Sequence, residues 1–196
     1  MTEKVLISRD TIRLHHKDSG SNGFNGYKVI EVDNRKEYIQ SAMTEKPDVL
    51  VQYMLKPDFS LITDIELMRK LLPEALFIGV LNYPHKYYIA EMLRAGVLGY
   101  LLITDIEELS QAVKYVSKLN IYISGKLRKA IAHDLLEMNL DSDKLFEHIN
   151  NDHIRNLLDH VGNGKTVDQI SSDMAISEQT VKSLVETLFI NWASKI

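Results

Sequence analysis

Short apolar runs alternate with stretches of helical periodicity over the first two-thirds of the chain. Five of these runs are rich in Val, Ile and Leu and have the length of strands covered on both faces. They lie at residues 5–7, 27–32, 48–53, 76–81 and 97–102. Regularly spaced apolar side chains predict helices between them, at residues 34–46, 60–72, 85–95 and from 105 onward. The alternation predicts an α/β fold, a doubly wound parallel (βα)5 sheet over residues 1–122.

Local signals mark where several of these helices begin and end. Asn34 is suited to cap the helix that follows it, and Gly96 is suited to end the helix at 85–95. The first crossover, residues 11–26, is rich in Gly, Ser and Asn, so any helix there is expected to be short.

Beyond Tyr122 the pattern is entirely helical. It predicts an interdomain helix and linker over residues 123–142, followed by an all-α domain over residues 143–196. In that domain a tight turn ending in Ser177, the expected N-cap, joins two helices at 167–174 and 178–192. Two such helices, preceded by a longer packing helix, are typical of a helix-turn-helix.

Several motifs resemble one family, the two-domain response regulators with a receiver domain and a LuxR/NarL-type helix-turn-helix. The most specific is the stretch 93–102, which is close to the family pattern "ALRAGASGYLLK". Further matching segments are 46–51, Pro57, 120–124, 164–170 and 176–182. The resemblance implies a flavodoxin-like receiver fold followed by a DNA-binding domain.

The receiver-like part departs from the family at its reactive positions. The resemblance places Tyr53 at the phosphoacceptor Asp, Asn82 at the Thr/Ser that senses the phosphoryl group and Ile103 at the conserved Lys; the acidic pair falls on Arg9 and Asp10. One Asp beside an Arg is a poor Mg²⁺ site, and a neutral phenol is no acyl-phosphate nucleophile. We therefore predict a pseudo-receiver that takes no phosphoryl group.

The resemblance also implies which residues face DNA. In the family the second helix of the motif enters the major groove. Thr180 and Lys182 could reach phosphates, and Val181 could touch a thymine methyl or pack in the core instead. The full set of candidate DNA contacts is Lys165, Ser177, Gln179, Thr180, Val181 and Lys182.

A cluster of tyrosines surrounds the fourth predicted helix and the fifth predicted strand. Tyr100 matches a switch aromatic of the family, and Tyr87 and Tyr88 lie nearby in sequence. Two interpretations stay open: packing beneath a loop, or an exposed protein–protein interface.

The distribution of charge conflicts with DNA binding. The chain carries a formal charge of −4, and residues 145–196 hold four bases against seven acids. Because DNA affinity comes mostly from phosphate neutralisation, we expect weak binding unless a dimer doubles the contacts. The resemblance also suggests a domain truncated before the family's dimerisation helix, with apolar residues left for a partner to cover. These residues are Leu184, Leu188, Ile190 and Trp192.

These features predict a DNA-binding transcriptional regulator that works without phosphorylation, as a homodimer or with a partner regulator. The alternative is an adaptor or antagonist that contacts proteins through both domains. Cysteine is absent, and the histidines lack the helical spacing of a metal site. We expect no enzymatic activity, metal or cofactor. The start of the chain is no signal peptide and no apolar run spans a bilayer, so a cytoplasmic, membrane-free protein is expected.

Overall fold

The computed structural model describes residues 3–8, 24–54, 59–137 and 151–194. These residues form two compact units, Met1–Ser124 and Gly125–Ile196. Among the helices of these ranges, none combines the length and apolar character that a bilayer span requires.

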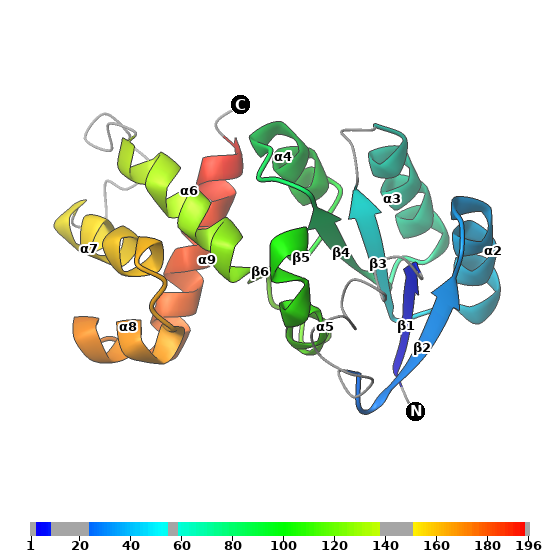
Figure 1. Ribbon diagram of the computed structural model, residues 1–196, viewed down its shortest axis with the longest axis horizontal. Coiled ribbons are helices and arrows are strands. Elements are labelled where there is room, and N and C mark those ends of the chain that lie inside the picture. Colours follow the sequence, from blue (N-terminus) through cyan, green and yellow to red (C-terminus); the bar gives the residue numbers. More distant parts are fainter. Residues whose placement is uncertain (1–2, 9–23, 55–58, 138–150, 195–196) are drawn as a thin grey trace. The chain divides into compact units, whose positions relative to one another are not determined.

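A parallel sheet of six strands forms the centre of the first unit, in the order β2-β1-β3-β4-β5-β6 (Figure 1). The strands are β1 (Glu3–Ser8), β2 (Tyr27–Val32), β3 (Val49–Met54), β4 (Leu76–Leu81), β5 (Gly99–Leu102) and β6 (Tyr122–Ile123). The first five confirm the predicted doubly wound sheet. The sixth was not predicted, because two residues carry no periodicity; it pairs through Tyr122 N–H to Leu98 O and Ser124 N–H to Tyr100 O.

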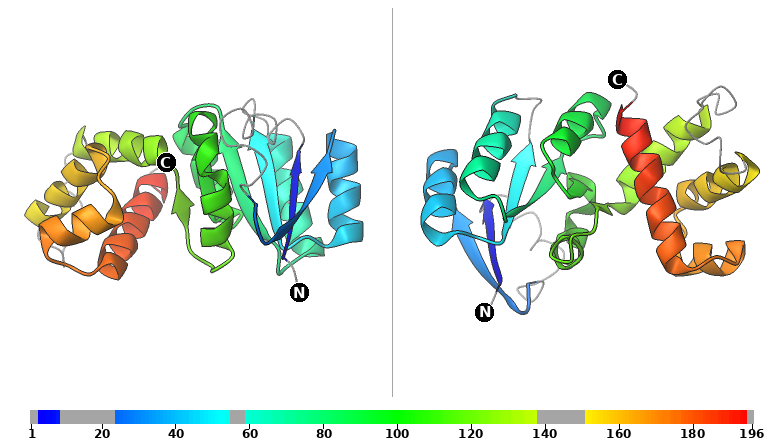
Figure 2. Two further views of the ribbon diagram at one scale, coloured as in Figure 1. Left: turned by 60° about the horizontal axis from the view of Figure 1, so that its bottom comes forward. Right: turned by 180° about the vertical axis from the view of Figure 1, so that it is seen from behind.

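Helices cover both faces of the sheet (Figure 2). They are α2 (Arg35–Glu45), α3 (Phe59–Leu71), α4 (Lys86–Arg94) and α5 (Leu109–Val116), which follows a 3₁₀ turn, η1 (Ile103–Glu108). Alternate strand residues pack against α5 in one apolar cluster, including Val5, Ile7, Val49, Val51, Ile78, Val80 and Leu101. Successive side chains of a strand point to opposite faces, so the intervening residues face the other helices. Burial on both faces explains why the strands are continuously apolar.

On the face of the sheet opposite α5, Arg69 joins α3 to the C-terminal end of α4. Its Nε and Nη2 donate to the carbonyl oxygens of Ala95 and Gly96 at 2.9 and 2.6 Å, and its guanidinium lies 5.3 Å from the Phe77 ring centroid. Gly96 has φ +78°, and a Cβ there would lie 2.7 Å from Arg69 Nη2. The glycine therefore ends α4, as predicted, and also admits the arginine.

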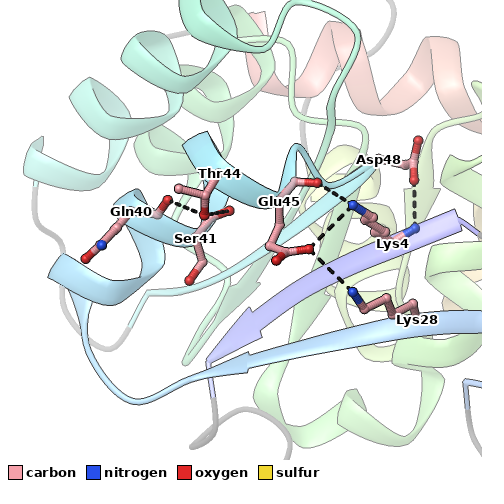
Figure 3. A network of polar contacts seen from close by, with 7 residues as sticks. All are labelled: Lys4, Lys28, Gln40, Ser41, Thr44, Glu45 and Asp48. Atoms are coloured by element: carbon pink, nitrogen blue, oxygen red, sulfur yellow. Dashed lines mark hydrogen bonds and ion pairs between the residues drawn. The ribbon is translucent and has the colours of Figure 1, made fainter.

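A polar network fixes the C-terminal end of α2 near the amino-terminal ends of β1 and β2 (Figure 3). Lys4 Nζ donates to Glu45 O at 2.7 Å, and the ammonium groups of Lys4 and Lys28 each lie 3.4 Å from Glu45 Oε2. Lys28, followed by Lys4, lowers the pKa of the Glu45 carboxyl. The Lys4 backbone N–H donates to Asp48 Oδ2 at 2.7 Å. The Glu45 carboxylate thus joins α2 to the adjacent strands β1 and β2.

In residues 125–137 and 151–194, the described part of the second unit, there are four helices: α6 (Gly125–Glu137), α7 (Asn151–Gly162), α8 (Val167–Met174) and α9 (Glu178–Ser194). Thr166 caps α8 in a capping box with Gln169, and Ser177 Oγ accepts from Thr180 N at 3.0 Å, which confirms Ser177 as the cap of α9. The helix-turn-helix pattern of α8 and α9 is as predicted; residues 143–150, at the start of the predicted all-α domain, lie outside the described residues.

Helix α6 lies within residues 123–142, the predicted interdomain helix and linker, and it is grouped with the other described helices in the second unit. The Trp192 indole N–H of α9 donates to Asp134 Oδ2 of α6 at 3.2 Å, and Leu188 and Trp192 are 4% and 2% exposed. The expectation that a partner covers these two side chains was wrong, because they are buried in the protein itself. Ile190 remains 39% exposed.

The turn between α8 and α9 holds Ala175 in the left-handed region, at φ 53° and ψ 40°. Glycine adopts this conformation without a Cβ penalty, so we expect Ala175→Gly to raise the free energy of unfolding of this unit by about 0.5 kcal/mol. Urea unfolding of the full chain measures it. Ala130→Gly, in the right-handed α6, is the matched control and should lower stability by about 1 kcal/mol. Equal losses in both variants would contradict the expectation.

Candidate functional site

The carboxyl ends of β3, β4 and β5 meet at one edge of the sheet, where α/β proteins place their sites. Tyr53 lies near the end of β3 and is paired in register with Val80 of β4, two residues before Asn82. Ile103 directly follows β5. The topology therefore brings three of the predicted receiver positions to one edge.

A single hydrogen bond joins the positions of the phosphoacceptor and the sensing residue. Tyr53 OH donates to Asn82 Oδ1 at 2.8 Å, across neighbouring strands. The tyrosine ring packs against the apolar cluster beneath α5. Burial raises the pKa of the Tyr53 phenol above its ordinary value, so this group is a neutral donor at physiological pH. A neutral phenol engaged in this way offers no carboxylate for an acyl phosphate.

Ile103 brings no polar group to this edge. Its side chain is partly buried and packs against the same apolar cluster as Tyr53. Arg9 and Asp10, the remaining predicted positions, lie outside the described residues. Within the described residues no group of three or more His, Asp or Glu side chains is placed to hold a metal ion.

Ser124 lies at this edge; the sequence included it only as the end of the matching segment 120–124 and predicted no role for it. Its side chain is fully buried, and Oγ accepts from the Leu102 backbone N–H at 3.1 Å. The bond closes the end of β5 beside Ile103. Only the pairing of β6, which carries Ser124 to β5, makes this contact, so no local pattern could have revealed it.

The tyrosine cluster divides into buried and exposed members. Tyr100 is 0% exposed, and its OH donates to Val97 O at 2.6 Å; burial raises the pKa of Tyr100 far above its ordinary value. Tyr88 is also buried, and its ring meets His85 edge to face at 4.8 Å. An exposed-interface role is therefore wrong for Tyr88 and Tyr100, which pack. Tyr83 and Tyr87 are exposed, and an interface role for Tyr87 stays a prediction.

The first turn of α9 presents polar side chains to solvent. Ser177, Gln179 and Thr180 are exposed, and Ser177 Oγ lies 2.8 Å from Thr180 Oγ1. Val181 is 0% exposed, so the suggested contact with a thymine methyl is wrong and the packing interpretation holds. The N-terminal turn of α9 is thus polar and exposed, while Val181 packs in the core of the helical unit.

Both lysines among the candidate DNA contacts are engaged by carboxylates. Lys165 Nζ lies 2.7 Å from Asp173 Oδ2, and Lys182 Nζ lies 3.5 Å from Glu178 Oε2. The hydrogen bond from Lys165 is the main cause of the lowered pKa of the Asp173 carboxyl. The basic side chains of this surface are therefore partly neutralised from within.

Solved structures of response regulators share this fold. A LuxR-family two-component response regulator from Aurantimonas sp. SI85-9A1 matches with a TM-score of 0.56 and 20% identity, over 70% of this chain and 100% of that chain. The RcsB response regulator of Salmonella typhimurium matches with a TM-score of 0.55 and 15% identity, over 99% of this chain and 94% of that chain. RcsB in its complex with DNA matches with a TM-score of 0.55 and 16% identity, over 100% of both chains.

Neither a protein-family model nor a curated protein sequence matches the chain. At the identities of the structural matches, the likeness shows the fold: a flavodoxin-like receiver fold followed by a helical domain.

The bond between Tyr53 and Asn82 can be tested by Tyr53→Phe. Removing the donor should lower the free energy of unfolding by about 0.5–1.5 kcal/mol, since Asn82 Oδ1 loses the hydrogen bond from the Tyr53 hydroxyl. Tyr27→Phe is the control, because no hydrogen bond of the Tyr27 hydroxyl to a described residue is present. A double-mutant cycle with Asn82→Ala isolates the pair. A coupling energy near zero would contradict the assigned bond.

Proposed function

We propose that the chain is a DNA-binding response regulator of the LuxR/NarL type that acts on transcription without being phosphorylated. The exposed polar first turn of α9, opposite the buried Val181, is the observation that carries the DNA-binding part. The RcsB–DNA complex, which has the same two-part fold, supports it. Gln179 and Thr180 would read or position the DNA, and Ser177 would hold the turn. The proposal places this regulator in the cytoplasm.

The bond between Tyr53 and Asn82 supports the phosphorylation-independent part. A receiver switch responds to a new charge at the end of β3, whereas this edge holds a neutral donor and acceptor and the apolar Ile103. The input is then a homodimer contact, a partner regulator or a small ligand, which acts through packing rather than through a phosphoryl group.

The second candidate is an adaptor that binds a protein through the same helical unit. The observation in its favour is the pairing of Lys165 with Asp173 and of Lys182 with Glu178, which leaves the candidate DNA surface with little free positive charge.

DNA binding by the full-length protein distinguishes the two. Fragments selected from the source genome, followed by fluorescence anisotropy over a salt series, should show affinity that falls steeply with salt. Lys182→Glu should lower affinity by roughly tenfold or more, because it places a negative charge against the DNA backbone. Lys70→Glu, the same change at an exposed position of α3, is the matched control. Absence of binding at low salt would favour the adaptor.

Resistance to phosphorylation is tested with beryllofluoride, a phosphoryl mimic, and with acetyl phosphate. We expect no Mg²⁺-dependent heat in calorimetric titration with beryllofluoride, and no mass increase after incubation with acetyl phosphate, since Tyr53 offers no carboxylate. A saturable heat of binding that requires Mg²⁺ would contradict the proposal.

A further inference from the structure

Two ion pairs connect acids to the bases of the candidate DNA surface. Lys165, just before α8, reaches along that helix to Asp173, with 2.7 Å between Nζ and Oδ2. Lys182 is joined to Glu178, one turn earlier in α9, with 3.5 Å between Nζ and Oε2. Glu followed by Lys at this spacing is the favourable order on a helix. Both lysines that this surface offers to phosphate are therefore held by an acid of the same motif.

The pairs are open to solvent, so a stronger anion can displace the carboxylates. The side chains of Lys165 and Asp173 are 36% and 44% exposed, and those of Lys182 and Glu178 are 32% and 54% exposed. Ion pairs of this exposure contribute little to folding. Their removal should thus leave the fold intact while changing what the lysines can bind.

We propose that Asp173 and Glu178 are intramolecular competitors of the DNA backbone, which hold Lys165 and Lys182 and thereby set a low affinity for DNA. This inference rests on the proposed DNA-binding function. A DNA phosphate has to replace the carboxylate at each lysine, and the displaced carboxylate stays close enough to repel the backbone. A lysine already neutralised by its own acid releases fewer DNA counterions on binding, which weakens the complex.

The two acids differ in the strength of their hold. Asp173 has the shorter contact, and the His160 side chain adds to the positive potential around its carboxylate. Glu178 lies in the first turn of α9, where a negative charge also favours the helix. Asp173 is therefore the acid whose removal should affect DNA binding more and stability less.

The test compares the full-length wild type with Asp173→Asn, Glu178→Gln and the double variant, in the same salt series and on the same DNA. Each release of one further counterion at about 0.1 M salt should raise affinity roughly eightfold and steepen the salt slope by about one. Asp159→Asn has the same charge change at an exposed position of α7, where no ion pair with a described residue exists. Asp159→Asn should raise the affinity for DNA by no more than about threefold.

A second arm shows whether Asp173 acts through its lysine. In a Lys165→Gln background, Asp173→Asn should gain little, whereas a general charge effect would raise affinity as much as in the wild type. Thermal unfolding of every variant verifies that the fold is retained.

The outcomes separate the inference from the function on which it rests. If the wild type binds DNA and the variants bind no better than Asp159→Asn does, the competitor role is overturned while DNA binding stands. Binding by the double variant and not by the wild type supports both. If no variant binds at low salt, both are overturned.

Discussion

Burial of the parallel sheet on both faces is the constraint on which the first unit depends. It requires apolar side chains on both sides of β3, β4 and β5. On one face, Arg69 of α3 donates a hydrogen bond to the Gly96 carbonyl oxygen at the end of α4. Because the strands are parallel, their carboxyl ends lie at one edge of the sheet. Tyr53 and Asn82 meet there because the sheet aligns their strands, and a neutral hydrogen bond joins the two positions that the resemblance matched to the family's phosphoacceptor Asp and its Thr or Ser.

Helix α9 has both buried and exposed side chains in the second unit. Its buried side chains, such as Val181 and Trp192, tie it to the rest of the helices, and the Trp192 contact with Asp134 makes α6 part of this core. Its exposed first turn offers polar groups, while the adjoining lysines are held by acids. The same unit therefore combines an exposed polar turn with lysines that are already paired with acids.

Most of the fold could be predicted from the sequence, because its signals are local. Apolar runs, turn residues and caps act within a few positions, so the five longer strands and the ends marked by Asn34, Gly96 and Ser177 are found as predicted. Strand β6 was not predicted, because two residues are too few to show a period.

At the candidate sites the sequence determined the chemical types: a phenol, an amide and an apolar side chain at the sheet edge, and polar residues with two lysines at the helix-turn-helix. The tertiary structure decided which of these groups meet. It buried Tyr100 and Val181, paired Tyr53 with Asn82, and placed Asp173 against Lys165. The identity of a residue specifies the charge and the hydrogen-bonding groups of its side chain. Its exposure and its partners depend on contacts between segments that only folding brings together.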